Sequence, residues 1–339
     1  MKILIIGGTG LVSRPLASTL VRQGHHVTVF NRGKTGLKHD APIDTIRGDR
    51  NNLGEFQQIM AGREFDAVID MICSTTAQAQ CDQRVFAGRT GHLIFCSTAA
   101  VYGNTQTNIP TTEGHIPIPI SAAAKEKLSC ERVFMEAQRS GRLNVTIFRL
   151  GETFGPGSPL LDNLGPASGC IERLRRGLPV VICGDGNGLK QSLYCEDAAR
   201  AIALAAGNRR TWGEIYNLTG PDIITWDQHT QKIAAAIGAP VPRIYHISTD
   251  MLLKMAPGRY PILAESHRFH CVYSGDKLRR DFPQFRHAVP FDEGVRRTVA
   301  WMDANPALLP PSRHSDHDRW ISRFDAVTDG IRAGNVATQ

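Results

Sequence analysis

The chain of 339 residues lacks an apolar run long enough to cross a membrane and lacks closely spaced cysteine pairs. A spanning helix needs about 20 consecutive apolar residues, so we expect no membrane partner. The eight cysteines include no C-x-x-C pair, and most fall in apolar segments. They are therefore expected to be buried, reduced thiols rather than disulfides or zinc ligands. Because an apolar strand starts almost at Met1, we expect no signal peptide and a cytoplasmic protein.

Long blocks of like charge are also missing, although the net charge is +7. Arginine pairs occur at 175–176, 209–210, 279–280 and 296–297, separated in sequence and not interleaved with aromatic residues. Solvated helix faces explain such pairs more simply than a nucleic-acid surface does. A nucleic-acid partner is therefore not expected, whereas phosphate on a small ligand would suit the positive charge.

The N-terminal stretch contains an apolar strand, a glycine turn and a helix. Ile3–Ile6 is a short apolar run typical of a central parallel strand, and apolar residues at helical spacing follow over 11–23. Gly7 would supply the tight turn, and Gly10 would let the backbone approach a pyrophosphate at the helix start. This order predicts a dinucleotide site in which Gly7, Gly10 and Leu11 contact the cofactor.

The residues after the second strand, 27–30, indicate which cofactor binds. Asn31 lies where a dinucleotide fold places the residue that contacts the adenosine ribose. An acidic residue there would hold the 2′-hydroxyl of NAD, whereas Asn31 with Arg32 and Lys34 nearby would accept a 2′-phosphate. The expected cofactor is NAD(P), with NADP favoured over NAD.

A third strand over 43–47 leads into Asp49 and Arg50. Asp49 is placed to meet the adenine amino group, and Arg50 follows it at the same cofactor. Asp49 has an equally good alternative role as the cap of a helix that begins near Leu53.

Strands and helices then alternate along the chain. The predicted elements are strands over 67–73, 93–97 and 145–150, with helices over 76–87 and 122–140. Such alternation predicts an α/β fold, a Rossmann-type doubly wound parallel sheet with ligands at the carboxyl ends of its strands. The segment directly after residue 97 would then face the site.

Composition changes after residue 150, where prolines and glycines interrupt the pattern. We expect an NAD(P)-binding domain over 1–150 with return segments near 190–215. A smaller, discontinuous substrate-binding domain would occupy 151–310, followed by a C-terminal tail over 311–339.

Several spaced motifs occur in one order along the chain. They are Gly7-Gly-Thr-Gly10, Ser97-Thr-Ala-Ala-Val-Tyr-Gly103, Lys127-Leu-Ser-Cys-Glu131, Gly155-Pro-Gly157, Gly184-Asp-Gly186, Glu196-Asp197 and Asn217. Together they resemble the extended short-chain dehydrogenase/reductases, the NAD(P)-dependent sugar-nucleotide epimerases, dehydratases and reductases. The resemblance reaches about residue 305. It implies hydride transfer at a hydroxyl of a sugar or nucleotide sugar, and a homodimer through the helices over 76–87 and 122–140.

In that family a Ser or Thr, a Tyr and a Lys carry the redox chemistry, with the last two spaced Y-x-x-x-K. The resemblance assigns Thr98 to the first role and Lys127 to the last, and it implies that Lys127 also binds the nicotinamide ribose. The tyrosine position is then Ala123. Without a phenol there, the family's usual proton relay is incomplete.

A carboxylate in the following loop offers a replacement base. Glu152 stands where the family usually has a substrate-contacting Asn, and a partly desolvated carboxylate beside the nicotinamide could accept the proton. Tyr102 competes for this role, although ordinary family members also keep a tyrosine there. Lys127, water or no base at all are the remaining alternatives.

A second loop resembles the family's diphosphate-binding loop. In the family this loop ends in an arginine, and here Lys190 keeps the charge but not the two-pronged geometry. The substrate-binding residues implied are thus Thr98, Glu152 and Lys190. The stretch His314-Ser-Asp-His317 would permit a metal, but exposed polar helix ends look the same, and we expect none.

Two other functions remain open. Chloroplast stem-loop RNA-binding proteins look like atypical members of this family with altered relays, so RNA binding is one alternative. A non-catalytic NAD(P)-binding regulator is the other. The presence of Thr98 and Lys127 favours the enzyme.

Overall fold

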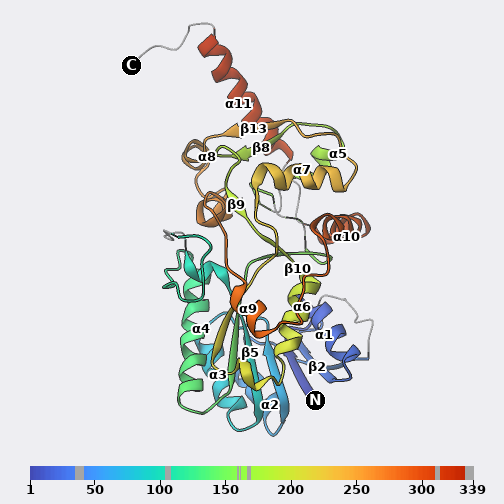
Figure 1. Ribbon diagram of the computed structural model, residues 1–339, viewed down its shortest axis with the longest axis vertical. Helices are drawn as coiled ribbons and strands as arrows, with labels where there is room; N and C mark the ends of the chain where they lie inside the picture. The colour runs from blue at the N-terminus through green and yellow to red at the C-terminus, as the bar shows by residue number, and fades with distance from the viewer. Residues whose placement is uncertain are drawn as a thin grey trace. The chain divides into compact units, whose positions relative to one another are not determined.

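The computed structural model describes residues 1–34, 42–103, 108–158, 160, 162–165, 169–309 and 314–332. They fall into two units, which Figure 1 shows in ribbon form. The first unit consists of Met1–Phe154, Gln191–Pro221 and Val272–Val289. The second consists of Gly155–Lys190, Asp222–Cys271 and Pro290–Gln339.

A seven-stranded sheet in the order β11-β6-β5-β4-β1-β2-β3 forms the centre of the first unit. Its strands are β1 (Lys2–Ile6), β2 (His26–Asn31), β3 (Asp44–Arg47), β4 (Phe65–Asp70), β5 (Thr90–Thr98), β6 (Val145–Leu150) and β11 (Glu214–Leu218). All neighbouring strands are parallel. The strand order reverses between β1 and β4, which is where doubly wound sheets bind ligands. The predicted Rossmann-type fold is confirmed.

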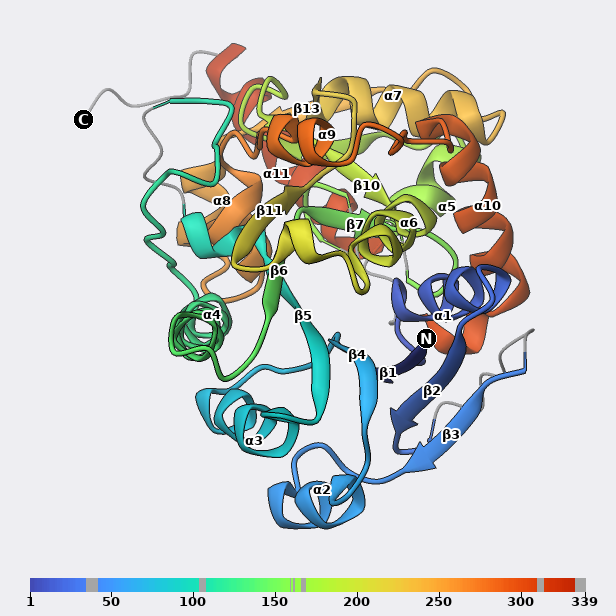
Figure 2. The same ribbon diagram turned by 60° about the horizontal axis from the view of Figure 1, so that its bottom comes forward.

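Helices cover both faces of this sheet, as Figure 2 shows. They are α1 (Ser13–Arg22) and α6 (Cys195–Ala205) on one face, and α2 (Leu53–Met60), α3 (Thr76–Phe86) and α4 (Ala122–Arg139) on the other. Residues Ile3–Ile6 of β1 are fully buried. Burial on both faces explains why this strand is a continuous apolar run rather than an alternating one.

Shorter elements complete the first unit. They are η1 (Ala99–Tyr102), β7 (Glu152–Phe154), β10 (Ser192–Tyr194), η2 (Arg209–Thr211) and α9 (Asp276–Asp281). β7 and β10 pair in parallel, with Glu152 in register with Ser192. After β6 the chain therefore enters a separate two-stranded sheet formed by β7 and β10.

The second unit combines helices with two small sheets. Its elements are α5 (Cys170–Arg175), β8 (Val180–Cys183), β9 (Leu189–Lys190), β12 (Ile224–Thr225), α7 (Trp226–Ala236), β13 (Ile244–Ile247), α8 (Thr249–Met255), η3 (Leu263–His267), α10 (Phe291–Ala304), η4 (Pro306–Leu308) and α11 (His314–Arg332). β8 pairs with β13 in parallel, and β9 pairs with β12 antiparallel. Whether this unit binds the substrate stays a prediction.

Strand β4 ends three residues earlier than the apolar run 67–73 predicts. Asp70 Oδ1 accepts the N–H groups of Ile72 and Cys73 at 2.8 and 2.7 Å. Because these N–H groups bond to a side chain, they cannot continue the sheet ladder. The chain turns there, and Ile72 becomes part of a cavity wall.

Residues 314–332 form a helix where the sequence analysis leaves a tail. Trp320 is buried in an apolar cluster of the second unit, and its Nε1 donates to Tyr260 Oη at 2.8 Å. Asp316 pairs with Arg259, and His317 Nδ1 accepts the N–H of Val181 at 2.9 Å. Asp316 and His317 thus fasten α11 to its own unit.

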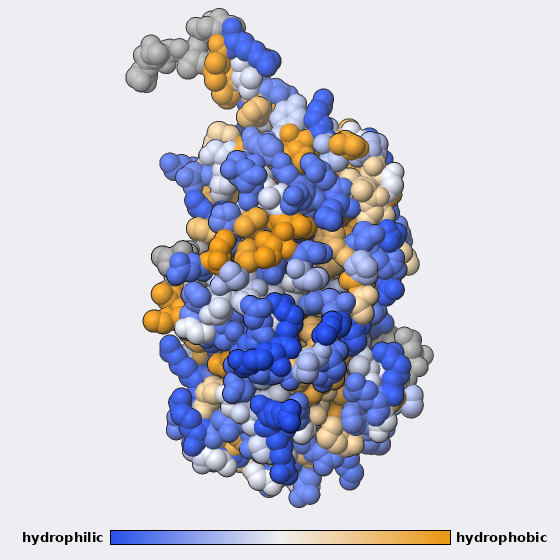
Figure 3. Space-filling view, in the orientation of Figure 1, coloured by the Kyte–Doolittle hydropathy of each residue, from blue (hydrophilic) through white to orange (hydrophobic). Residues whose placement is uncertain are grey.

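The surface of the molecule is mostly polar on the face shown in Figure 3, where hydrophilic side chains lie between smaller apolar patches. Among the helices of the described ranges, none is both long and apolar enough to span a bilayer.

Candidate functional site

The turn between β1 and α1 contains Gly7 and Gly10. Gly7 has a φ of +90°, and a Cβ on it would lie 2.4 Å from Ile72 Cγ2, so only glycine fits. Its N–H donates to the carbonyl oxygen of Phe30 at 2.9 Å. The capping residue of α1 is Val12, which offers no side-chain bond, and the first turn has no acid. The N–H of Arg14 donates to the carbonyl oxygen of Gly10 at 3.1 Å, and Pro15 has no N–H. The start of α1 therefore offers an anion mainly its positive dipole end.

Small residues keep this turn compact. Ser13, at the third glycine position of the dinucleotide pattern, begins α1 and is buried. A Cβ on Gly10 would lie 3.2 Å from Ser13 Oγ. Leu11 is half-buried and does not line the adjacent cavity.

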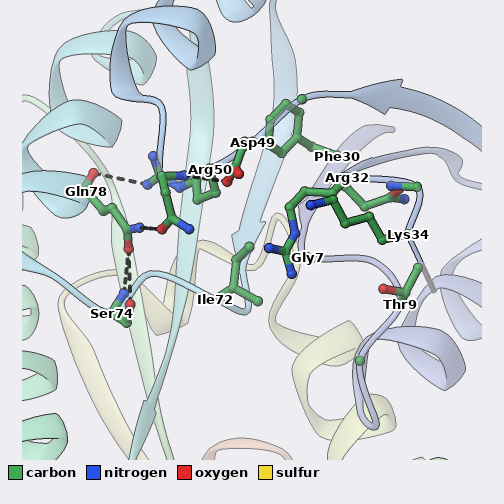
Figure 4. A pocket seen from close by; sticks show the side chains of 15 residues that line it. Gly7, Thr9, Phe30, Arg32, Lys34, Asp49, Arg50, Ile72, Ser74 and Gln78 are labelled. Atoms are coloured by element: carbon green, nitrogen blue, oxygen red, sulfur yellow. Dashed lines mark hydrogen bonds between the residues drawn. The ribbon is translucent and has the colours of Figure 1, made fainter. Parts of the chain in front are cut away.

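A cavity of about 350 Å³ opens at the switch point of the sheet (Figure 4). Its lining consists of Gly7, Thr9, Gly10, Phe30, Asn31, Arg32, Gly33, Lys34, Gly48, Asp49, Arg50, Asn51, Ile72, Ser74 and Gln78. Five segments meet here: the glycine turn, the ends of β2, β3 and β4, and the start of α3. The cavity collects every residue expected to contact the cofactor except Leu11 and Lys127.

The end of β2 supplies two cations to this cavity. Asn31 Oδ1 accepts the N–H of Gly33 at 2.8 Å, which fixes the turn after the strand. Arg32 and Lys34 are exposed, and neither has an ion-pair partner among the described residues. Figure 4 shows the cationic ends of both side chains extending into the same space.

A third cation, Arg47, was not identified from the sequence. It ends β3 in register with Asn31, and its Nε would lie 3.4 Å from a Cβ on Gly33. Arg47 likewise has no ion-pair partner within the described ranges. The sequence did contain a clue to Arg47, because pairing of the second and third strands places the ends of both at one edge of the sheet.

Asp49 does not cap the following helix. That role belongs to Asn52, whose side-chain oxygen accepts the N–H of Glu55 at 3.2 Å. Asp49 Oδ1 instead accepts the N–H of Asn51 at 2.9 Å, on the cavity wall. The capping alternative is therefore wrong.

Arg50 touches the cavity, but its guanidinium is engaged inside the first unit. Nη2 lies 2.7 Å from Asp82 Oδ1 and 3.3 Å from Asp70 Oδ2, and the group covers the ring of Phe56 at 4.3 Å. Burial disfavours the charge, but Asp82 and Asp70 outweigh it and raise the pKa of Arg50. In this structure Arg50 supports the cavity wall rather than reaching toward a ligand.

Thr98 and Lys127 both lie near the carboxyl end of β5. Thr98 is the last residue of the strand, and its Oγ1 accepts the N–H of Ala100 at 3.2 Å. Lys127 extends from α4, where its Nζ donates to the carbonyl oxygen of Cys96 at 2.7 Å. Ala123, one turn earlier on α4, is exposed. The position that the resemblance gives to the tyrosine thus faces open space.

Glu152 lies at the same edge of the sheet. It is the first residue of β7, two residues after Leu150, and Leu150 is in register with Thr98. Its side chain is half-buried. Parallel strands end at one edge of a sheet, so Glu152 and Thr98 project from the same edge.

Tyr102 is fully buried in the first unit. Its hydroxyl donates to Asn217 Oδ1 at 2.7 Å, and its ring lies between Tyr273, at 5.9 Å, and the Arg149 guanidinium, at 4.7 Å. Burial raises the pKa of Tyr102. A buried phenol with a raised pKa is a poor proton acceptor, so these contacts favour a packing role.

Lys190 belongs to the second unit, where it is 3% exposed. Its Nζ lies 3.9 Å from the centre of the Trp226 ring. The residue implied to bind a diphosphate is thus packed inside its unit.

The sequence that forms the cavity matches a known family. The family model described as "NAD dependent epimerase/dehydratase family" matches residues 3–219. The chain belongs to this family. Its members are NAD-dependent enzymes, so the predicted family and the prediction of an enzyme are both confirmed.

Several known proteins are similar to this chain. 2′-Dehydrokanamycin reductase of Streptomyces kanamyceticus is 27% identical over 286 residues, covering 84% of this chain and 80% of that protein. Chloroplast stem-loop binding protein of 41 kDa b from Arabidopsis thaliana is 28% identical over 259 residues, covering 72% and 65%. The structure of dTDP-glucose 4,6-dehydratase from Bacillus anthracis in complex with NAD matches with a TM-score of 0.72 and 16% identity, covering 91% and 98%. This last match shows the fold alone.

Proposed function

We propose that this chain is an NADP-dependent oxidoreductase or epimerase that moves a hydride at a hydroxyl-bearing carbon of a carbohydrate. The observation that carries the proposal is the cavity at the switch point, where the glycine turn before α1 shares the lining with Arg32 and Lys34. Asn31 replaces the acidic residue that a 2′-hydroxyl would call for. A phosphate on the adenosine ribose would give both cations their counter-charge.

The residues at the carboxyl end of β5 would carry the proton chemistry. When bound, the nicotinamide supplies or accepts the hydride. Thr98 would hold the substrate oxygen, and Lys127, anchored at Cys96, would contact the nicotinamide ribose. Because Ala123 offers no phenol, we assign the base to Glu152.

Two relatives support a sugar-type substrate. One is the reductase of 2′-dehydrokanamycin, and another is dTDP-glucose 4,6-dehydratase of Actinoplanes sp., 26% identical over 341 residues, covering 90% of this chain and 98% of that protein. A homodimer through α3 and α4 stays a prediction.

The cofactor preference gives the direct test. Titration of the protein with NADPH and NADH, followed by nicotinamide fluorescence, should show NADPH binding at least about 10-fold more tightly. The double variant Arg32→Ala/Lys34→Ala should lose this preference and keep its NADH affinity. Arg296→Ala removes a paired surface cation of the second unit and serves as the control. Equal affinities of the unmodified protein for NADPH and NADH would contradict the proposed preference for NADP.

RNA binding is the second candidate, favoured by the match to the stem-loop binding protein. Three of the four arginine pairs argue against it, because their members already bind carboxylates. Arg175 pairs with Asp303, Arg279 with Asp276, and Arg296 with both Asp292 and Glu293. RNA binding through phosphates must weaken steeply with salt. Sub-micromolar RNA binding at physiological salt, with no small molecule that alters bound cofactor, would replace the enzyme proposal.

A further inference from the structure

Glu131 ends the motif that begins at Lys127, yet it has no part in the chemistry proposed above. Lys127 Nζ donates to the carbonyl oxygen of Cys96 at 2.7 Å. One turn later on α4, Glu131 is 2% exposed, and its Oε1 accepts the hydroxyl group of Ser97 at 2.5 Å. Because side chains four positions apart share one face of a helix, these two residues of α4 hold two consecutive residues near the carboxyl end of β5.

The carboxylate of Glu131 also holds strand β6. Arg149 Nη2 donates to Glu131 Oε2 at 2.7 Å, and Arg149 Nε donates to Glu131 Oε1 at 3.1 Å. Arg149 is 4% exposed, and it is in register with Ser97 where β5 pairs with β6. Glu131 thus joins one helix and two strands near the edge of the sheet at which these parallel strands end.

The residues that bond to Glu131 are neighbours of the residues with proposed chemical roles. Ser97 directly precedes Thr98, and Arg149 lies three residues before Glu152. A shift of α4 relative to the ends of β5 and β6 would therefore change where Lys127 lies relative to both Thr98 and Glu152.

The apolar contacts of α4 constrain its position less narrowly than these bonds do. On α4 the ring of Phe134 packs against that of Phe95 of β5, with 4.9 Å between ring centres. Such burial is non-directional, whereas hydrogen bonds require short distances and favourable angles. A buried ion pair can often be replaced by apolar side chains without loss of stability. The pair of Glu131 and Arg149 is therefore better explained by the position that it imposes than by the stability that it adds.

We propose that Glu131 is a positioning residue, which through its bonds to Ser97 and Arg149 sets where Lys127 meets the nicotinamide ribose. The contact between Lys127 and the ribose rests on the proposed function, whereas the position of Lys127 against β5 does not. Removal of the buried pair should therefore have two separable effects. Lys127 should lose its fixed position on β5, and the affinity for the cofactor should fall as a consequence.

The chemical reactivity of Lys127 tests its position without any cofactor. Trace labelling with acetic anhydride, measured by mass spectrometry, gives the acetylation rate of Lys127 relative to Lys125, which is exposed on the same helix. In Glu131→Leu/Arg149→Met this ratio should rise at least about 2-fold, because the ammonium loses a hydrogen bond. Phe134→Leu lowers stability without touching the pair and should leave the ratio unchanged. A folded double variant with the original ratio would overturn the proposal.

Cofactor binding separates a failure of this proposal from a failure of the proposed function. Glu131→Leu/Arg149→Met should bind NADPH at least about 10-fold more weakly than the unmodified protein, while Phe134→Leu should keep the original Kd. A raised labelling ratio with an unchanged Kd would overturn the link between Glu131 and the ribose. If the unmodified protein does not bind NADPH, the proposed function fails, and the labelling ratio still decides whether Glu131 positions Lys127.

Ser97→Ala provides the same readout if the double variant does not fold. This substitution removes one hydroxyl group and keeps the buried charges paired, so the protein should remain folded. The labelling ratio of Lys127 to Lys125 should still rise, by a smaller factor than in the double variant, because β5 loses one of its two bonds to α4. A ratio equal to that of the unmodified protein would then overturn the proposal.

Discussion

Three cations near the cavity of the first unit are exposed, whereas Lys190 of the second unit is buried. Arg32, Lys34 and Arg47 gather at the ends of β2 and β3 without ion-pair partners among the described residues. In the second unit Lys190 is 3% exposed, and its ammonium lies 3.9 Å from the centre of the Trp226 ring. A cation kept unpaired beside a cavity is available to a phosphate, whereas a paired one belongs to the fold. Among the described residues, Arg32 and Lys34 are therefore better placed to meet a phosphate than Lys190 is.

The first unit contains its own contrast, between Arg50 and Arg32. Both line the cavity, but Arg50 also neutralises the buried Asp82 and Asp70. Arg50→Met should lower the free energy of unfolding by about 3–5 kcal/mol, because two buried carboxylates lose their partner. Arg32→Ala should change it by less than about 0.5 kcal/mol. Urea denaturation followed by circular dichroism measures both. Equal stabilities of the two variants would break the distinction between paired and unpaired cations.

The pH dependence of stability sharpens the comparison in the second unit. Burial raises the pKa of Asp162 from its ordinary value of 3.8 to about 7 in the folded protein. Between pH 4 and pH 7 the folded protein keeps a proton that the unfolded chain releases, so this carboxyl makes stability fall as pH rises. The loss is on the order of 4 kcal/mol and is complete above pH 7.

Asp162→Asn should remove this slope. Its stability relative to the unmodified protein should therefore rise between pH 4 and pH 7 and then stay level. Lys190, Cys170 and Cys183 are titratable groups that interact with Asp162, and Cys170 bonds to its side chain, so Cys170→Ser serves as a control for that thiol. A relative stability that does not change with pH across this window would show that Asp162 titrates normally.

Much of the first unit follows from local sequence patterns. The bounds of β6 are those expected from the apolar run 145–150, and the glycine turn lies where Gly7 and Gly10 predict it. These features depend on backbone geometry and on short apolar runs, which neighbouring residues determine. The parallel direction of the strands follows from the βα alternation.

Contacts between distant segments were not predictable in the same way. Arg47 comes to lie beside Gly33 through strand register, and Lys190 packs on Trp226, 36 positions later by residue number. Trp320 packs into the second unit although its neighbours in sequence are mostly polar. A sequence shows which residues are charged or apolar, but it does not show which partner a charge meets.

The comparison extends to two carboxylates, Asp162 inside the second unit and Glu152 at the sheet edge of the first. If Glu152 is the base, it accepts the proton from the substrate hydroxyl while Thr98 holds that oxygen. Glu152→Gln keeps the shape and removes the basic oxygen. Turnover should fall by roughly 100-fold, about 2.7 kcal/mol in the activation free energy, while NADPH affinity stays nearly constant.

Two matched variants show whether the fall in turnover of Glu152→Gln comes from lost proton transfer. Lys127→Ala should weaken cofactor binding as well as turnover, because its ammonium is expected at the nicotinamide ribose. Tyr102→Phe removes only the hydroxyl bonded to Asn217, so it should lower stability with a smaller change in turnover. A Glu152→Gln enzyme with full activity, together with an inactive but folded Tyr102→Phe, would move the base to the buried tyrosine. Loss of turnover in Glu152→Gln alone, with a changed pH profile, would keep the role of base with Glu152 at the sheet edge.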